Sequence, residues 1–185
     1  MLVLASHSPR RREILTNAGI PFVTRRSSEV DETPRPGEAP EAYVRRLARE
    51  KAESVECGVD EVILGADTSV VVDALLLGKP ADPADAVRML RALSGRDHKV
   101  MTGVCLRSAG RSIEDCAVTR VWFSRLTDTQ IEEYATSGEP MDKAGAYGIQ
   151  GLASKFIPRI EGCYFNVVGL PIALVAQLLS TMRNI

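Results

Sequence analysis

Apolar positions recur along this chain with two periods, one typical of helices and one typical of strands. The stretches with helical spacing open with residues that favour a helix start, four prolines and one threonine. The predicted helices run from Pro9 to about Gly19, Pro40 to about Gly58, Pro83 to about Gly95, Thr127 to about Gly138, and onward from Pro171. The predicted strands are Met1–Ala5, Phe22–Thr24, Val62–Leu64, Ser69–Val72, Lys99–Arg107, Ser112–Ser124, Lys155–Ile160 and Tyr164–Val168.

The order of these elements predicts the fold class. Strands alternate with helices in the first half, and the two long strands that follow are separated only by Ser108–Arg111, which favours an antiparallel hairpin. A sheet with both kinds of connection is mixed, and helices pack against it. We therefore expect an α/β fold with a mixed, twisted sheet and flanking helices.

Composition limits the domain count and the partners. The 185 residues are 45% hydrophobic and 25% charged, which is typical of a globular protein. They contain no repeat and no linker long enough to separate domains, so one domain spanning residues 1–185 is expected. With a net charge of −1, the chain has no overall positive electrostatic field that would attract nucleic acid or anionic lipid. A polyanionic ligand would therefore need a local cluster of cations.

Cysteine and histidine usage indicates a compartment and excludes some chemistry. The four cysteines are scattered, without metal-site spacing, which predicts reduced thiols in a cytoplasmic protein. With only His7 and His98, the chain has little material for a histidine metal site or a Ser-His-Asp triad. No run of 18 apolar residues is present, so no membrane partner is expected.

The start of the first predicted helix combines hydroxyl and guanidinium groups. Ser6 and Ser8 precede three arginines, Arg10–Arg12, in the first turn. Cations there disfavour an isolated helix by roughly 0.3–1 kcal/mol each, because the helix dipole is positive at its N-terminus. The free N–H groups of a helix start bind anions, and arginine strengthens such a site for phosphate. This pattern favours a phosphate site over a solvated basic turn.

Two acidic residues and two lysines are further candidates. Asp67 follows a buried strand, where open α/β sheets bind ligands, and its carboxylate suits a divalent cation or a proton transfer. Glu32, or its neighbour Asp31, precedes a proline-rich loop and could assist a metal. Lys51 and Lys79 supply cations. Taken singly, each residue also has an ordinary structural explanation. Asp67 could cap a turn, Glu32 could belong to an acidic surface patch, and the two lysines could be surface residues.

The glycine-rich stretch Gly138–Gly151 holds the last candidates. Its four glycines among alternating charges predict a loop that closes around a ligand, and a structured loop without special function is the alternative. Gln150 offers an acceptor and two donors to a nucleobase edge. The chain has no Walker A loop. It also has no G-x-G-x-x-G after a strand, and this second absence weighs against a nicotinamide or flavin enzyme.

Four blocks together resemble the Maf family of nucleoside triphosphate pyrophosphatases, over essentially the whole chain. They are Leu4–Arg11, Gly65–Thr68, Gly78–Pro80 and Gly138–Gly151, in the family's order. The resemblance implies an inosine-triphosphatase-like fold with two lobes around a central cleft. It also implies hydrolysis of a nucleoside triphosphate to the monophosphate and pyrophosphate, with Mg²⁺ or Mn²⁺ as cofactor. The segment Asp142–Gly151 resembles the branch that acts on dTTP and UTP.

The resemblance also implies roles for single residues. Asp67 would accept a proton from the attacking water, and Lys51 and Lys79 would complete the catalytic set. The metal would be held by Glu32 and Asp67. The expected substrate-binding residues are Ser6, Ser8, Arg10, Arg11 and Lys143, and those expected to select the base are Arg10, Thr68 and Gln150.

Two other functions stay open. One is a nucleotide-binding regulator of cell division that acts without turnover, as the family's septum-formation name suggests. The other is a phosphatase that removes the γ-phosphate, which would release orthophosphate instead of pyrophosphate. By analogy with relatives, a homodimer is expected.

Overall fold

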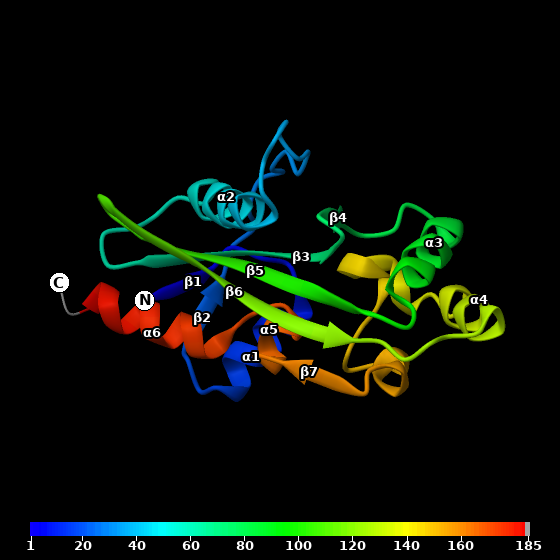
Figure 1. Cartoon of the computed structure of the whole chain (residues 1–185). Helices are drawn as coiled ribbons and strands as arrows, with labels where there is room; N and C mark the ends of the chain where they lie inside the picture. Colours follow the sequence, from blue (N-terminus) through cyan, green and yellow to red (C-terminus); the bar gives the residue numbers. More distant parts are fainter. Residues whose placement is uncertain (184–185) are drawn as a thin grey trace. The chain divides into compact units, whose positions relative to one another are not determined.

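The computed structural model describes residues 1–183 and shows a mixed α/β fold (Figure 1). The described strands form a seven-stranded sheet in the order β2-β1-β3-β5-β6-β7, and β4 pairs with β3. The strands are β1 (Leu2–Leu4), β2 (Phe22–Thr24), β3 (Val62–Val72), β4 (Leu75–Leu77), β5 (Asp97–Ser108), β6 (Arg111–Trp122) and β7 (Arg159–Glu161). The helices are α1 (Pro9–Asn17), α2 (Pro40–Glu53), α3 (Pro83–Leu93), α4 (Asp128–Thr136), α5 (Tyr164–Val168) and α6 (Ile172–Arg183). The predicted fold class is confirmed.

Contacts within the chain divide it into two compact units. Unit 1 consists of Met1–Thr68, Thr102–Ala117 and the chain from Gly169 on, and unit 2 consists of Ser69–Met101 and Val118–Val168. The chain passes between the units four times, and β3, β5 and β6 each have residues in both. The crossings fall within or beside regular elements, which explains why the sequence shows no linker. The predicted cleft stays a prediction.

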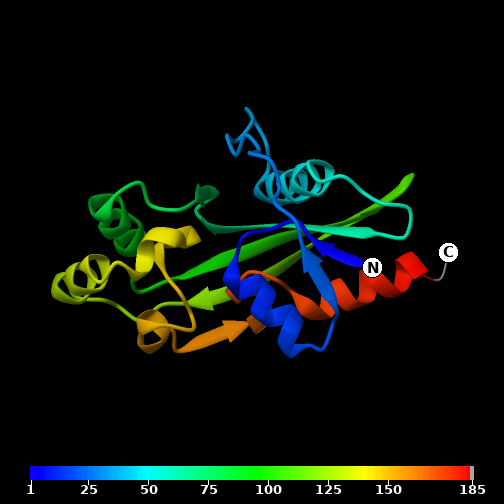
Figure 2. The ribbon, with the colours of Figure 1, turned by 180° about the vertical axis from the view of Figure 1, so that it is seen from behind.

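Unit 1 has helices on both faces of its strands. β1 lies between β2 and β3 and pairs in parallel with each. Helix α2 lies over one face, and α1 and α6 lie over the other, as both views show (Figure 1 and Figure 2). Val3 and Ile63 from the strands pack with Ala48 and Ala52 from α2 in a fully buried cluster.

Helix α2 lies so close to the strands that two positions require glycine. A Cβ on Gly65 of β3 would overlap the carbonyl oxygen of Ala48, and one on Gly103 of β5 would overlap that of Val44. Both overlaps are with helix backbone, which cannot rotate away as a side chain can. The absence of side chains at these two positions therefore sets the separation between α2 and the strands.

We predict that Gly65→Ala lowers the free energy of unfolding by about 1–3 kcal/mol, because the added methyl group forces α2 away from β3. Urea unfolding followed by circular dichroism measures the change. Gly78→Ala is the matched control, since a Cβ there meets no atom within 4 Å. Equal midpoints for the two variants would contradict the close-packing argument.

The structure differs from the predicted elements in three places. The two predicted strands around Asp67 are one continuous strand, β3, so Asp67 lies inside a strand and not at its end. The pairing with β1 stops at Leu64, but β3 continues beside β5, which keeps the later residues extended. A 3₁₀ helix, Leu152–Phe156, replaces the first part of the predicted strand Lys155–Ile160. The strand β7 begins only at Arg159.

The predicted strand Tyr164–Val168 is wrong, because these residues form the short helix α5. The amide of Asn166, a fully buried residue, donates to the carbonyl oxygen of Val100 and to the hydroxyl of Thr119. These contacts within unit 2 stabilise the helical turn against the strand propensity of its aromatic and β-branched side chains.

Unit 2 has its own core, in which a histidine lies among aromatic rings. His98 is 2% exposed, and a hydrogen bond of 2.7 Å joins its Nε2 to the hydroxyl of Tyr147. The ring of Phe123 packs edge-on against both. Burial lowers the pKa of His98 from 6.5 to about 4, an effect that Asp97 opposes and Arg96 reinforces. His98 is therefore neutral in the folded protein at pH 7.

The buried His98 predicts a loss of stability in weak acid. The unfolded chain binds a proton at His98 below about pH 6.5, whereas the folded chain does so only near pH 4. The neutral His98 therefore does not reduce the free energy of unfolding above pH 6.5. The free energy of unfolding decreases as the pH falls from there toward 4. Between pH 7 and 5 the free energy of unfolding should fall by about 2 kcal/mol more in the wild type than in His98→Gln, which does not titrate there. Urea unfolding at both pH values measures this difference, and equal losses would contradict it.

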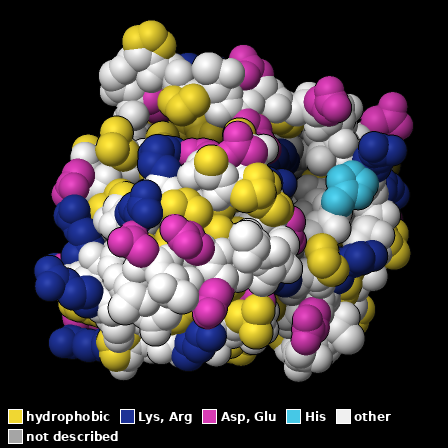
Figure 3. Space-filling view, turned by 90° about the vertical axis from the view of Figure 1, so that its right-hand side faces the viewer, with side chains coloured by type: hydrophobic (Ala, Val, Ile, Leu, Met, Phe, Trp, Pro, Cys, Tyr) yellow, Lys and Arg dark blue, Asp and Glu magenta, His cyan; other side chains and the backbone are white. Residues whose placement is uncertain are grey.

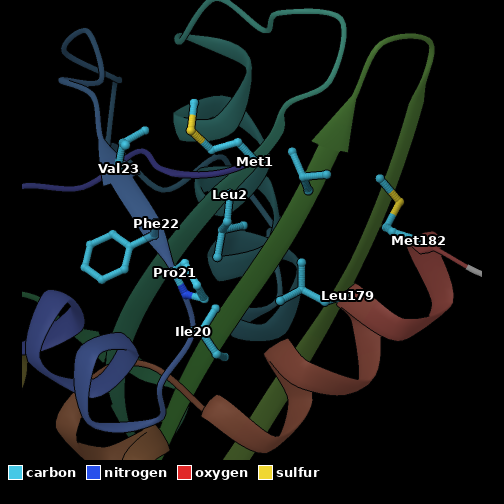
Figure 4. A pocket seen from close by; sticks show the side chains of 9 residues that line it. Met1, Leu2, Ile20, Pro21, Phe22, Val23, Leu179 and Met182 are labelled. Atoms are coloured by element: carbon cyan, nitrogen blue, oxygen red, sulfur yellow. The ribbon is translucent and has the colours of Figure 1, made fainter.

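Unit 1 also contains an apolar pocket of about 550 Å³ (Figure 4). Its nine lining residues are all apolar and come mainly from β1, β2 and α6, among them Leu2, Phe22 and Leu179. It therefore offers no charged side chain for phosphate or a metal ion. Within the described residues, no helix is long and apolar enough to span a membrane.

Candidate active site

The candidate active site in unit 1 is centred on the ammonium group of Lys51, on α2. Its Nζ donates to Oδ1 of Asp67 at 2.6 Å and to Oε1 of Glu32 at 2.7 Å. Asp67 is 7% exposed, whereas the side chain of Glu32 is 57% exposed. The three groups thus form a line from the buried strand β3 to the solvent. The structure brings together three residues that lie far apart in the sequence and that we predicted for one reaction centre.

The predicted helix start is formed and belongs to the same unit. Ser8 caps α1 by accepting the backbone N–H of Arg11, and Pro9 is the first helical residue. The hydroxyl of Ser6 accepts the backbone N–H of Ser8 at 3.2 Å. Arg10 is half-buried in this first turn. The hydroxyl and guanidinium groups predicted for a phosphate site therefore lie in one turn, and their contact with substrate stays a prediction.

Arg11 binds the protein on both sides of Asp67. Its guanidinium donates to the carbonyl oxygen of Ala66 at 2.7 Å and to the hydroxyl of Thr68 at 3.3 Å. A further bond, of 2.9 Å, goes to the carbonyl oxygen of Gly169. Burial lowers the pKa of Arg11, although the charge of Asp67 opposes this. Arg11 thereby fixes the segment of β3 that carries Asp67, a role that we did not predict from the sequence.

The loop that carries Glu32 is held by a buried arginine of α2. Arg46 is 5% exposed and donates to the carbonyl oxygens of Asp31 at 3.4 Å and Thr33 at 3.2 Å. Two further bonds, of 2.6 and 2.8 Å, go to the carboxylate of Glu38. The arginine lowers the pKa of Glu38 to about 2, and the carboxylate raises the pKa of Arg46. The residues on both sides of Glu32 are therefore fixed.

Tyr43 completes this support, because its hydroxyl donates to the carbonyl oxygen of Glu32 at 2.7 Å. We did not predict Arg46, Glu38 or this role of Tyr43 from the sequence. One signal was present: Arg46 follows Tyr43 by three residues, on the face that α2 buries, and Glu50 lies four residues later as a partner for its charge. A charged residue on a buried helix face requires such partners.

We predict that Arg46→Leu lowers the free energy of unfolding by about 3–5 kcal/mol, because it leaves the carboxylate of Glu38 without its main partner. Arg91→Leu is the matched control, since Arg91 pairs with Asp128 at an exposed site on the surface of unit 2. Its cost should stay below about 1 kcal/mol. Chemical denaturation of both variants tests the contrast, and similar losses would contradict it.

Three predicted site residues lie in unit 2. Lys79 and Gln150 are exposed. The ammonium group of Lys143 donates to the backbone carbonyl oxygen of Glu139 and to the carboxylate of Asp142, each at 2.6 Å. Lys143 therefore stabilises its own loop in this structure. Roles for Lys79, Lys143 and Gln150 beside a substrate stay predictions.

The glycine-rich loop closes on its own side chains. A Cβ on Gly148 would lie 2.7 Å from Cε of Lys143, and one on Gly151 would overlap the carboxylate of Glu139. Gly145 has a φ of +69°, and a Cβ there would lie 2.7 Å from Val70. Packing within the loop explains Gly148 and Gly151, and packing of the loop against β3 explains Gly145. Contact with a ligand, which the sequence pattern suggested, stays a prediction.

The carboxylates of Glu32 and Asp67 suit a divalent cation that is also bound by substrate. Among the described residues, no cluster of three or more histidine, cysteine or acidic side chains could hold a metal on its own. Glu32 and Asp67 nevertheless converge on one cationic group, the ammonium of Lys51. Mg²⁺ typically binds one or two protein carboxylates and takes its other ligands from substrate phosphates and water. The donor set fits this arrangement.

Comparison with known proteins identifies similar chains. A family profile described as "Maf-like protein" matches residues 1–182. A dTTP/UTP pyrophosphatase of Pseudoalteromonas atlantica is 50% identical, with 98% of this chain and 97% of that protein covered. The protein of the same name from Chromobacterium violaceum is 50% identical (97% and 93% covered), and that from Photobacterium profundum is 47% identical (100% and 97% covered). A solved structure of a HAM1 protein from Coxiella burnetii is similar with a TM-score of 0.46 and 19% identity, over 68% of this chain and 73% of that one.

Proposed function

The chain belongs to the Maf family, and on that premise we propose that it hydrolyses dTTP and UTP to the nucleoside monophosphate and pyrophosphate. Relatives that are 47–50% identical over nearly the whole chain are named for this activity. The single observation that carries the proposal is the pair of carboxylates, Asp67 and Glu32, that share the ammonium group of Lys51. This arrangement offers a proton acceptor beside a cationic group, as hydrolysis of a charged anhydride requires.

Asp67 is the proton acceptor of the proposed reaction. The oxygen of a water molecule attacks the α-phosphorus, and its proton passes to the carboxylate of Asp67. The bond between the α-phosphorus and the bridging oxygen breaks, and pyrophosphate leaves with that oxygen. The ammonium group of Lys51 keeps Asp67 and Glu32 in place. Lys51 and Lys79 offset negative charge on the departing group.

Glu32 and Asp67 are the residues that would hold Mg²⁺ or Mn²⁺. The chemistry that such a cation supplies is neutralisation of charge on the phosphate oxygens and a lower pKa of bound water. The substrate's own oxygens would complete the ligand set, which is why two protein carboxylates suffice.

The triphosphate needs local cations, because the overall charge of −1 does not attract it. On the face shown in Figure 3, acidic and basic side chains are interspersed. We assign the phosphate groups to the start of α1 and to the glycine-rich loop, through Ser6, Ser8, Arg10, Arg11 and Lys143. Arg10, Thr68 and Gln150 select the base. In unit 1 the hydroxyl of Thr68 lies 2.9 Å from that of Thr102.

The remaining properties extend the same proposal. A nucleoside triphosphate is the partner, and we expect neither nucleic acid nor a membrane to bind. We propose a cytoplasmic location, in line with the scattered cysteines, which are free thiols in this structure. A homodimer remains our expectation by analogy with relatives.

We predict that Asp67→Asn reduces pyrophosphate release from dTTP and UTP by at least about 100-fold, since an amide does not accept the proton of water. The thermal midpoint should stay close to that of the wild type. Asp128→Asn, at an exposed position on α4, is the matched control and should keep full activity. Release of orthophosphate by the wild type, or an active Asp67→Asn, would overturn the assignment.

A further inference from the structure

The loop that carries Gln150 is tied by a chain of hydrogen bonds through Tyr134 and Glu139. The hydroxyl of Tyr134 donates to Oε1 of Glu139 at 2.8 Å. The same hydroxyl accepts the backbone N–H of Gly148 at 3.2 Å, and Oε2 of Glu139 accepts that of Leu152 at 2.9 Å. The two side chains therefore hold both ends of a five-residue segment whose central residue is Gln150.

The direction of each bond in this chain is fixed. Tyr134 is 3% exposed, and its ring packs edge-on against Phe156 with centroids 5.7 Å apart. Burial, and the bond to the carboxylate of Glu139, raise the pKa of the Tyr134 hydroxyl, so it keeps its proton. With that proton donated to Glu139, the oxygen lone pairs of the hydroxyl are available for the N–H of Gly148.

The carboxylate of Glu139 has little freedom to move. The ammonium group of Lys143 donates a hydrogen bond of 2.6 Å to the backbone carbonyl oxygen of Glu139. Gly151 packs directly against the carboxylate, where any Cβ would overlap both oxygens. A side chain at position 151 would therefore displace the group that binds Leu152.

We propose that Glu139 and Tyr134 are positioning residues that orient Gln150 for recognition of the base. The inference rests on the proposed function, in which the amide of Gln150 reads the pyrimidine. An amide discriminates bases only if its donor and acceptor point in fixed directions, because the wrong base must leave polar groups unpaired. Loosening the segment thus reduces the difference between bases. The Asp67–Lys51 pair, which belongs to unit 1, is left intact.

Tyr134→Phe tests this proposal, because it keeps the buried ring and removes only the hydroxyl. The measured quantity is the ratio of kcat/KM for UTP to that for ATP. This ratio should fall about tenfold, mainly through a higher KM for UTP, because the variant loses both hydrogen bonds of the hydroxyl, to Glu139 and from the N–H of Gly148. Tyr164→Phe, at an exposed tyrosine of α5, is the matched control and should keep the wild-type ratio.

Glu139 provides a second, graded test. Glu139→Ala removes both acceptors and should lower the ratio at least as far as Tyr134→Phe does. Glu139→Gln retains one acceptor oxygen and should recover part of the selectivity. Glu133→Ala, at an exposed glutamate of α4, is the matched control. Thermal midpoints identify any variant that loses selectivity only by unfolding.

A double-mutant cycle separates positioning from general support of the fold. Gln150→Ala alone should lower the ratio, and adding Tyr134→Phe to it should change the ratio no further, because the hydroxyl acts through Gln150. Additive losses in the double variant would overturn the proposal. An unchanged ratio in Tyr134→Phe, or an equal loss of kcat/KM for every nucleotide, would also overturn it.

Binding of non-hydrolysable α,β-methylene analogues of UTP and ATP keeps the test independent of turnover. A wild type that prefers the UTP analogue but releases no pyrophosphate would overturn the proposed hydrolysis alone. In that case a tenfold loss of binding preference in Tyr134→Phe still supports positioning of Gln150. An unchanged preference in the variant opposes it.

Discussion

The close approach of α2 to the strands of unit 1 determines the geometry of the reaction centre. Without a side chain at Gly65 or Gly103, the backbone of α2 packs directly on the strands. Lys51 lies one turn beyond Ala48, the residue whose carbonyl oxygen faces Gly65. Its ammonium group therefore reaches Asp67, two residues after Gly65 on β3, at 2.6 Å. Larger side chains at these two positions would move α2, and with it Lys51, away from the carboxylate of Asp67.

One polar side chain and two pairs of polar side chains each support a candidate functional residue through the neighbouring backbone. Each binds carbonyl oxygens, N–H groups or hydroxyls next to the candidate residue, and so fixes the main chain while the functional side chain stays available. They are Arg11 beside Asp67, Arg46 with Tyr43 beside Glu32, and Glu139 with Tyr134 beside Gln150. Preorganised supports of this kind reduce the motion that a reacting group must lose on binding substrate.

Local signals in the sequence were enough to predict most helix starts and the fold class. Ser8 with Pro9, and Thr127 with Gln130, act within one turn, and the structure shows the predicted caps. The failures concern contacts between residues far apart in the sequence. The strand around Asp67 continues because β5 pairs with it. Residues Tyr164–Val168 are helical because Asn166 donates hydrogen bonds to β5 and β6. The buried role of Arg46 likewise depends on a distant loop, although its position on the buried face of α2 was a usable signal.

The position of Lys51 between two carboxylates has a consequence for folding. Two acidic groups brought together in a partly buried place repel each other, and proteins commonly need a bound ion to bring such groups together. Here the covalently attached ammonium group serves as the resident counter-ion. The protein thus supplies from its own sequence the positive charge that offsets the repulsion between these two carboxylates.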